Sequence, residues 1–203
     1  MVSALSSVAS LDMLAGYAFS SADFATDTGI PLLRGINVTP EIIRWEDVIY
    51  WDREVPKELL SFQLQANDIV LGLDRPWVNS GTRVAVITEK DLPCMLVQRV
   101  CRIRPKKGGD YRFILHCIQS KAFEDTLSVS ATGVSVPHIS TKQIGNYVVA
   151  FPPETEQKAI CEYLERKCGQ IGKMMEIKQK IIEKLQDYKK SLIYEVVTGK
   201  REV

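Results

Sequence analysis

The sequence is poor in the residues that build metal sites. It has two histidines, His116 and His138, and five cysteines, none of which pairs with another in a C-x-x-C spacing. A four-ligand zinc site needs a cluster of such side chains, so we expect no zinc site. An odd number of cysteines without close pairs is typical of reduced thiols, and we expect them to be mostly buried in a cytoplasmic protein.

Long apolar runs and catalytic motifs are also missing. No apolar run approaches the ~20 residues of a membrane-spanning helix, and the N-terminus lacks the basic-then-apolar pattern of a signal peptide. The chain has no G-x-G-x-x-G, G-x-x-x-x-G-K-[ST], H-E-x-x-H or G-x-S-x-G. Phe151-Pro-Pro-Glu154 lacks the leading amide and the closing aromatic of the amino-methyltransferase motif. We therefore expect a protein that is not an enzyme.

Charge is nearly balanced over the whole chain but is unevenly distributed along it. The net charge is +1, which by itself does not indicate a nucleic-acid binder. Residues 99–112 contain six arginines and lysines and one acidic residue, Asp110. This basic cluster is either a surface that faces phosphate groups or a solvated strand end and hairpin, and charge alone does not decide between them.

The C-terminal part of the chain predicts one long coiled-coil helix over residues 152–199. Pro152 and Pro153 suit the entrance of a helix, no later proline interrupts the pattern, and Gly199 suits a C-terminal cap. Apolar residues recur with a period close to 3.5. The predicted seam contains Leu164, Ile171, Met174, Lys178, Ile181, Leu185, Tyr188 and Leu192.

A helix of this length needs a packing partner. About 43 residues at about 1.5 Å each span roughly 65 Å, whereas a domain of about 150 residues has a radius of gyration of only about 15 Å. The partner is either an antiparallel helix within this chain or a second molecule. Because no other long helical pattern occurs in the sequence, we expect a second molecule, with Lys178 helping to set the register.

Residues 1–151 predict an α+β domain built mainly on mixed or antiparallel sheet, and residues 200–203 a flexible tail. Strands are expected within residues 30–38, 68–73, 82–88 and 95–104 and at Val148 and Val149. Helical spacing runs from Tyr111 to about Leu127, and residues 128–140 are expected to form a loop. Alternation within residues 95–104 predicts a half-buried strand, with Arg102 and Arg104 on the face opposite Cys101 and Ile103.

Several motifs together resemble the specificity subunits of type I restriction–modification systems. The helix region resembles the conserved region of that family in Pro152-Pro153, Glu156-Gln157, Ile160, Leu164 and Thr198-Gly199-Lys200. Further stretches stand in the order expected of its target-recognition domain: Gly16-Tyr-Ala-Phe19, residues 30–37, Asn67-Asp-Ile-Val70 and Thr132-Gly-Val-Ser-Val-Pro-His138. The resemblance covers almost the whole chain. A glycine commonly stands in the family where Ala66 or Asn67 precedes Asp68.

The resemblance implies a subunit that recognises double-stranded DNA in a sequence-specific way. Family members usually carry two recognition domains and two long helices, so this chain resembles half of a specificity subunit. Two copies would pair as an antiparallel homodimer on an interrupted palindrome. Modification (methyltransferase) subunits, and through them restriction subunits, would join the complex, and S-adenosylmethionine and ATP would bind only to those partners.

Two alternatives stay open at this point. The chain could be a protein–protein adaptor that dimerises through its helix and does not bind DNA, or a stand-alone enzyme such as a methyltransferase.

The candidate DNA contacts lie in loops of the recognition domain. Arginine suits guanine, and asparagine or glutamine suits adenine. The candidates for contact are Arg34, Asn37, Arg75, Trp77, Asn79, Arg83, Thr132, Ser135 and His138, with Lys106 and Lys107 better suited to phosphate.

Structural roles are the alternative for several of these candidates. Arg34 could tie down its strand through a carboxylate, Trp77 could pack in the core or at its rim, and His138 could be a hydrogen-bonded loop residue. Thr132 and Ser135 could satisfy backbone groups of their loop.

Overall fold

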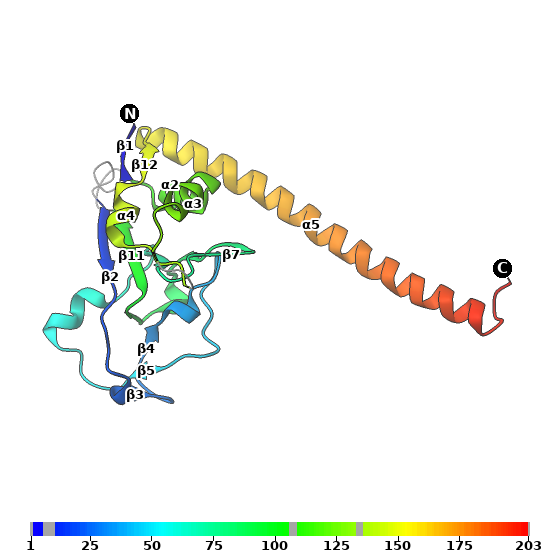
Figure 1. Ribbon diagram of the computed structural model, residues 1–203, viewed down its shortest axis with the longest axis horizontal. Helices are drawn as coiled ribbons and strands as arrows, with labels where there is room; N and C mark the ends of the chain where they lie inside the picture. The colour runs from blue at the N-terminus through cyan, green and yellow to red at the C-terminus, as the bar shows by residue number, and fades with distance from the viewer. Residues whose placement is uncertain (1, 6–10, 106–108, 133–135, 203) are drawn as a thin grey trace. The chain divides into compact units, whose positions relative to one another are not determined.

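A computed structural model describes residues 2–5, 11–105, 109–132 and 136–202 (Figure 1). The chain divides into two compact units, Met1–Lys158 and Ala159–Val203. The first unit contains the sheets and the short helices, and the second contains most of one long helix. The predicted α+β class with a long C-terminal helix is therefore confirmed.

The central layer of the first unit is a four-stranded antiparallel sheet in the order β2-β11-β6-β9. Its strands are β2 (Leu11–Ala15), β11 (Val100–Pro105), β6 (Ile69–Gly72) and β9 (Val84–Val86). Cys101 of the central strand β11 lies opposite Ala15 on one side and Leu71 on the other.

The strand predicted over residues 95–104 differs from the observed structure in two ways. The segment forms two strands, β10 (Met95–Leu96) and β11, which a turn separates. Residues Val100–Ile103 are also all buried, because the central sheet is covered on both of its faces. Arg102 is only 4% exposed and still lies on the face opposite Cys101.

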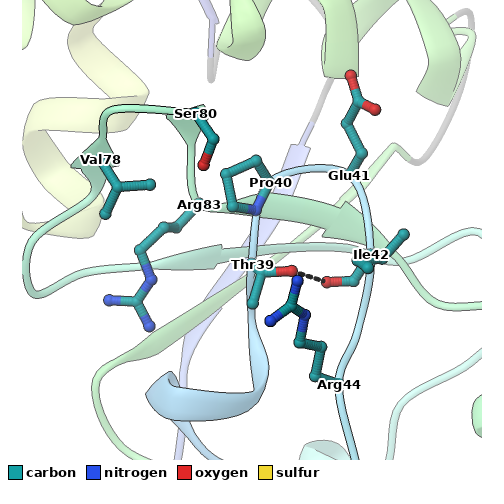
Figure 2. A pocket seen from close by; sticks show the side chains of 8 residues that line it. All are labelled: Thr39, Pro40, Glu41, Ile42, Arg44, Val78, Ser80 and Arg83. Carbon is teal, nitrogen blue, oxygen red and sulfur yellow. Dashed lines mark hydrogen bonds between the residues drawn. The ribbon is translucent and has the colours of Figure 1, made fainter. Parts of the chain in front are cut away.

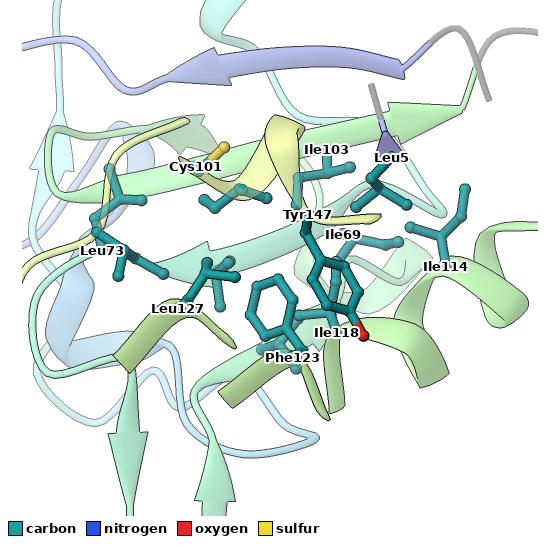
Figure 3. Close-up of a cluster of buried hydrophobic side chains, with 14 residues drawn as sticks. Leu5, Ile69, Leu73, Cys101, Ile103, Ile114, Ile118, Phe123, Leu127 and Tyr147 are labelled. Atoms are coloured by element: carbon teal, nitrogen blue, oxygen red, sulfur yellow. The ribbon is translucent and has the colours of Figure 1, made fainter. Parts of the chain in front are cut away.

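Three helices cover one face of the central sheet: α2 (Tyr111–Gln119), α3 (Lys121–Ser128) and α4 (Thr141–Asn146). Figure 3 shows Ile69, Cys101 and Ile103 of the sheet within one cluster with Ile118 and Phe123 of the helices. Tyr147 meets Phe123 edge to face, with ring centroids 5.1 Å apart, a geometry that aromatic pairs prefer.

The single helical segment predicted from Tyr111 to Leu127 is two helices. Ser120 ends α2 with its backbone N–H bonded to the Cys117 carbonyl. Its hydroxyl accepts a hydrogen bond from the Phe123 N–H at 3.2 Å and thereby caps α3. Serine at this position suits a helix start better than a helix interior.

A second sheet covers the other face of the central sheet, in the order β10-β4-β5-β3. It consists of β10, β4 (Ile30–Leu33), β5 (Tyr50–Trp51) and β3 (Phe24–Ala25), with β10 and β4 parallel. Leu33 and Leu96 from this sheet pack with Val70, Ala85 and Val100 from the central one. The predicted mixed sheet is thus present.

Short elements complete the first unit. β7 (Trp77–Val78) and β8 (Gly81–Thr82) form a hairpin, and β1 (Val2–Ala4) pairs antiparallel with β12 (Val148–Ala150). The 3-10 helices are η1 (Ser21–Asp23), η2 (Gly35–Asn37), η3 (Lys57–Phe62) and η4 (Glu89–Asp91).

The turn before β6 takes a backbone conformation that suits its sequence. Asn67 has a φ of 68°, in the left-handed region that asparagine enters more readily than most residues. Asp68 follows as a 1% exposed carboxylate that accepts a hydrogen bond from the Gln65 N–H at 2.8 Å. An asparagine therefore supports the turn without the glycine that is common in the resembled family.

The long helix α5 runs over Glu154–Val197, two residues inside each predicted bound. Gln157 is buried near its start, donates to the Pro152 carbonyl and accepts from the Asp110 N–H at 3.0 Å. At the other end Gly199 has a φ of 69°, and the Lys200 N–H reaches the Glu195 carbonyl at 2.8 Å. The C-terminal end therefore has the glycine cap that the sequence predicted.

Most of the predicted seam is exposed along this helix. Ile171, Met174, Ile181, Leu185 and Tyr188 are each 50–60% exposed. Lys178 is exposed, and Leu164 and Leu192 are half-buried. No helix among the residues that the structure describes is both long enough and apolar enough to cross a membrane.

Candidate nucleic-acid interface

The side chain of Arg83 bonds to two other segments of the domain. Its Nε donates to the Val38 carbonyl at 3.0 Å, its Nη1 to the Asp74 carbonyl at 2.8 Å, and its Nη2 to the Gly35 carbonyl. Burial lowers the pKa of Arg83 below its ordinary value, although Asp74 acts in the opposite direction. Arg83 thus fastens residues 35–38 to the segment that follows β6.

Arg34 and Asn37 also bond within the chain. Asn37 is 2% exposed, accepts from the Arg34 N–H at 3.0 Å and donates to the Arg44 carbonyl at 2.8 Å. Arg34 ties its segment down as anticipated, but through the backbone carbonyl of Asp47 and not through a carboxylate. We therefore leave Asn37 and Arg83 out of the surface that could contact a base.

The hairpin of β7 and β8 and the residues just before it supply exposed side chains. Arg75 is exposed with a φ of 45°, and its backbone N–H donates to the Pro137 carbonyl at 2.7 Å. Asn79 is exposed at the hairpin tip. Trp77 is half-buried and packs against the core under the helices. This is the packing role that the sequence analysis gave as the alternative to DNA contact.

Thr132 and His138, before α4, bond to each other, and His138 also contacts Asp74. Thr132 and His138 exchange backbone hydrogen bonds at 3.0 and 2.7 Å, and His138 Nδ1 lies 2.7 Å from Asp74 Oδ1. His138 is thus a hydrogen-bonded loop residue, and the Thr132 side chain is exposed. The candidates Ser135, Lys106 and Lys107 lie outside the described residues.

Most of the arginines in the basic cluster of residues 99–112 form internal ion pairs. Arg102 pairs with Asp12 at 2.6 Å, Arg104 with Asp68 at 2.5 Å, and Arg112 with Asp110 at 2.7 Å. The hydrogen bonds that Arg104 donates to the Asp68 carboxylate raise the pKa of Arg104. These three side chains therefore do not build a phosphate-facing surface.

Arg99 behaves differently from these three arginines. Its side chain is 60% exposed, and its Nη1 lies 3.5 Å from Asp74 Oδ1. Sequence reasoning noted Arg99 only as part of the basic cluster, and it omitted Gln98 and Arg44 from the candidates. The available signal was the polar pair Gln98-Arg99 between the apolar residues 95–97 and 100–101.

Two open cavities flank Arg83. One of about 430 Å³ lies between residues 39–44 and the hairpin, with Arg44 and Ser80 in its lining. Figure 2 shows the Thr39 hydroxyl bonded to the Ile42 carbonyl in its wall. The other, of about 560 Å³, has Arg34 and Arg99 in its lining beside apolar side chains such as Ile36.

The exposed side chains around Arg83 have the chemistry of base-edge and phosphate recognition. Arg44, Arg75 and Arg99 carry positive charge, and Asn79 and Gln98 carry amides that both donate and accept. They project from backbone that Arg83 and the loop hydrogen bonds hold in place. We call the exposed residues Arg44, Arg75, Asn79, Gln98, Arg99 and Thr132 the recognition rim.

Cys94 and Cys101 are buried in the domain. Burial raises the pKa of both Cys94 and Cys101 to about 12, so both are protonated thiols near neutral pH. Across residues 2–5, 11–105, 109–132 and 136–202, no group of three His, Cys, Asp or Glu side chains is placed to hold a metal ion.

Comparisons with known proteins agree with the resemblance seen in the sequence. Residues 1–187 match the family model for the type I restriction modification DNA specificity domain. The chain is 34% identical over 155 residues to the type I restriction enzyme EcoAI specificity subunit of Escherichia coli, covering 76% of this chain and 26% of that protein. It is 30% identical over 191 residues to the MjaVIII specificity subunit of Methanocaldococcus jannaschii, covering 94% of this chain and 44% of that protein. The chain thus spans less than half the length of these two relatives.

Solved structures share the fold at low sequence identity. A structure described as the basis of complex assembly and conformational transition of the type I R-M system aligns with a TM-score of 0.73 at 15% identity, covering 96% of this chain and 45% of that one. The HsdS subunit from Thermoanaerobacter tengcongensis aligns with a TM-score of 0.60 at 17% identity, covering 85% and 38%. At this level of identity the likeness is one of fold.

Proposed function

Because the chain belongs to the family of type I restriction modification DNA specificity domains, we propose that it recognises one half of a bipartite DNA target and has no catalytic activity of its own. The recognition rim is the observation that supports this proposal. It combines exposed arginines and amides, which suit guanine and adenine edges, with a backbone held by Arg83. Rigid support matters because a reading side chain must reach a base edge in one geometry.

We also propose that two copies of the chain pair through the long helix. Its seam residues, most of them exposed, recur at heptad spacing over residues 164–192, a pattern that needs a facing helix. Antiparallel pairing of two identical chains gives two-fold symmetry, so the target would be an interrupted palindrome. The helices would then fix the gap between the two half-sites.

The remaining activities would belong to other subunits. In this proposal methyltransferase subunits bind to the specificity subunit, restriction subunits join through them, and S-adenosylmethionine and ATP bind to those partners. The chain would supply DNA sequence recognition and a scaffold for assembly.

DNA binding can be tested directly with the full chain and a pool of random duplexes. We expect selection of one bipartite sequence, and an affinity that falls linearly in a plot of log affinity against log salt, because each neutralised phosphate releases counterions. A slope near zero, or a selected pool without any sequence preference, would contradict the proposal.

The pairing can be tested with the seam. Ile181→Asp or Leu185→Asp should give monomers, because each places a charge in an apolar interface. Lys180→Asp is the matched control: it adds the same side chain to an exposed position beside the seam and should leave the mass unchanged. Size-exclusion chromatography with light scattering measures the mass of each variant. An unchanged mass for both seam variants would show that the seam is assigned wrongly.

Exposed apolar residues near the recognition rim favour a second candidate, a helix-dimerised protein–protein adaptor. Ile36 and Ile42 are 59% and 53% exposed, and Val78 of the hairpin is 44% exposed. Exposed apolar side chains on one region can mark a protein interface. Replacing Arg44, Arg75 and Arg99 together with alanine would leave an adaptor intact but would abolish DNA binding.

A further inference from the structure

The turn between β10 and β11 presents two polar side chains on a fixed backbone. Gln98 and Arg99 are exposed, whereas Val97 and Val100 on either side are 5% and 0% exposed. The Gln98 N–H donates to the Tyr17 carbonyl at 2.8 Å, and the Arg99 carbonyl accepts from the Leu73 N–H at 2.9 Å. Hydrogen bonds to neighbouring segments therefore fix the backbone of Arg99.

The backbone of Arg99 is in an unusual conformation. Its φ is 71°, in the left-handed region that residues other than glycine rarely adopt. Such conformations persist where the surrounding structure holds them, and they are concentrated at functional sites. The hydrogen bonds of this turn supply that restraint.

The guanidinium of Arg99 is oriented but remains available to solvent. The Nη1 atom lies 3.5 Å from Asp74 Oδ1, and the side chain is 60% exposed. Arg34 and Arg83, which line the same cavity, instead donate to backbone carbonyls. Among these three arginines Arg99 has the guanidinium that is available for a ligand outside the domain.

Asp74 is itself held in place on two sides. His138 Nδ1 lies 2.7 Å from the same Oδ1 atom, and the Asp74 carbonyl accepts from Arg83. A carboxylate held in this way fixes the direction of a neighbouring guanidinium and leaves its other donors unused. A pre-oriented arginine fork is the side chain best suited to the two acceptors of a guanine in the major groove.

We propose that Arg99 reads a guanine in the half-site and that Asp74, held by His138, is the positioning residue for its guanidinium. This assignment rests on the proposed function and adds a specificity-determining residue to it. It places base recognition at the lip of the cavity of about 560 Å³, on the turn that follows β10.

The test is selection from a random duplex pool with the full chain and four variants: Arg99→Ala, Arg99→Lys, Asp74→Asn and Arg53→Ala. Arg53 is a matched control, because it is 59% exposed and also pairs with an aspartate, Asp23. Circular dichroism and thermal unfolding show that each variant folds. Affinity for the selected duplex, and for duplexes with each base pair replaced, gives the discrimination at every position.

We expect Arg99→Ala to lose roughly 5- to 150-fold of discrimination at one guanine and little elsewhere, which corresponds to one bidentate contact. Arg99→Lys should keep the salt dependence but lose most of that discrimination, because an ammonium group lacks the planar fork. Asp74→Asn should weaken discrimination at the same position only, and Arg53→Ala should keep the wild-type profile.

Two results would overturn the assignment of Arg99. They differ in whether the proposed function is also contradicted. If the wild-type chain selects a sequence and both Arg99 variants keep its full discrimination at every guanine, the assignment is wrong and the proposed function stands. If the wild-type chain selects no sequence at all, both are wrong.

Discussion

At the scale of single residues, the arginines of the recognition domain differ in the partner of the guanidinium group. Arg83 donates to three backbone carbonyls, and Arg102 and Arg104 pair with carboxylates. A guanidinium used in this way cannot also bond to a base without losing a bond inside the domain. Arg99 of the rim also has an ion-pair partner, Asp74, but its side chain is 60% exposed. In the proposed function, contact with DNA and support of the loops therefore fall to different side chains.

Replacing Arg83 with alanine should destabilise the domain. Three carbonyls would lose a charged donor, and hydrogen bonds to charged groups contribute about 1.5–3 kcal/mol each while partial access to water offsets part of the loss. We expect a loss of about 3 kcal/mol and a Tm lower by roughly 6–12 °C. Thermal unfolding measured by circular dichroism checks this.

Arg75→Ala is the control for Arg83→Ala, because the Arg75 side chain is exposed and the residue bonds to the Pro137 carbonyl through its backbone N–H. It should change stability by no more than about 0.5 kcal/mol. Equal melting temperatures for the two variants would show that Arg83 does not fasten residues 35–38 to the segment after β6.

Asp110 should contribute to the pH dependence of stability. It accepts from the Arg112 N–H at 2.9 Å at the start of α2 and pairs with the Arg112 guanidinium at 2.7 Å. The hydrogen bond from the Arg112 side chain lowers the pKa of Asp110, and burial opposes this only in part. A carboxyl group whose pKa is lower in the folded state stabilises the protein above the unfolded pKa of about 3.9 and loses this contribution as the pH falls below it.

Asp110→Asn should therefore flatten the loss of stability on acidification. We expect the free energy of unfolding to fall less steeply in the variant than in the wild type between about pH 5 and pH 2. Urea unfolding at several pH values measures this. Asp125→Asn, at a side chain that is 64% exposed, should follow the wild-type curve, and an Asp110 variant that does the same would contradict the assignment.

Residue roles at the site could be predicted only in part, because the deciding contacts come from distant segments. Asn79 lies at the tip of a hairpin and Arg75 just before it, in a polar segment whose exposure follows from local sequence. Arg83 and Asn37 looked like equally good DNA contacts, since nothing near them in the sequence shows which carbonyls they reach. The carbonyl of Val38 lies 45 positions away from Arg83, so its role depends on the tertiary fold.

At the scale of elements, the long helix could be predicted from local sequence, whereas the burial of the strands depends on distant segments. The helix α5 could be predicted to within two residues at each end because its prolines, heptads and final glycine are local signals. The burial of residues 100–103 could not, because alternation within one strand does not reveal a second sheet on its polar face. The separation of α2 and α3 at Ser120 could have been predicted, since serine is a common helix cap.

Gly16 should be essential for the way β2 leads into the second sheet. A Cβ at this position would lie 2.1 Å from the Val97 carbonyl oxygen and 2.3 Å from its carbon. These are backbone atoms beside the Gln98-Arg99 turn, and they cannot move as a flexible side chain would. The close approach explains a glycine here without any unusual φ.

Gly16→Ala should therefore cost about 1–3 kcal/mol or more of stability through overpacking and displace the turn. Denaturant unfolding measures the first effect, and loss of discrimination in duplex selection measures the second. Ala15→Gly is a useful control, because it changes the neighbouring position without adding an atom. A Gly16→Ala protein with wild-type stability would contradict this role.

At the scale of the whole molecule, the balance of charge limits how tightly one domain can hold DNA. The net charge of +1 gives little long-range attraction, so a single half-site should be bound through the local contacts of the rim. Two linked domains bind the second half-site at a high effective concentration. In the proposed homodimer, the exposed seam of α5 would thus matter for affinity as well as for symmetry.

The combined prediction compares two duplexes, one with both half-sites and one with a single half-site. The wild-type chain should prefer the first by roughly 10²- to 10⁴-fold, the range that linkage of two sites provides. Leu185→Asp should bind both duplexes equally, with the single-site affinity of the wild type, because each recognition domain is intact but no longer linked. Lys180→Asp should keep the preference. If Leu185→Asp also keeps it, the two half-sites are linked by something other than the seam, and the spacer role of the helix is wrong.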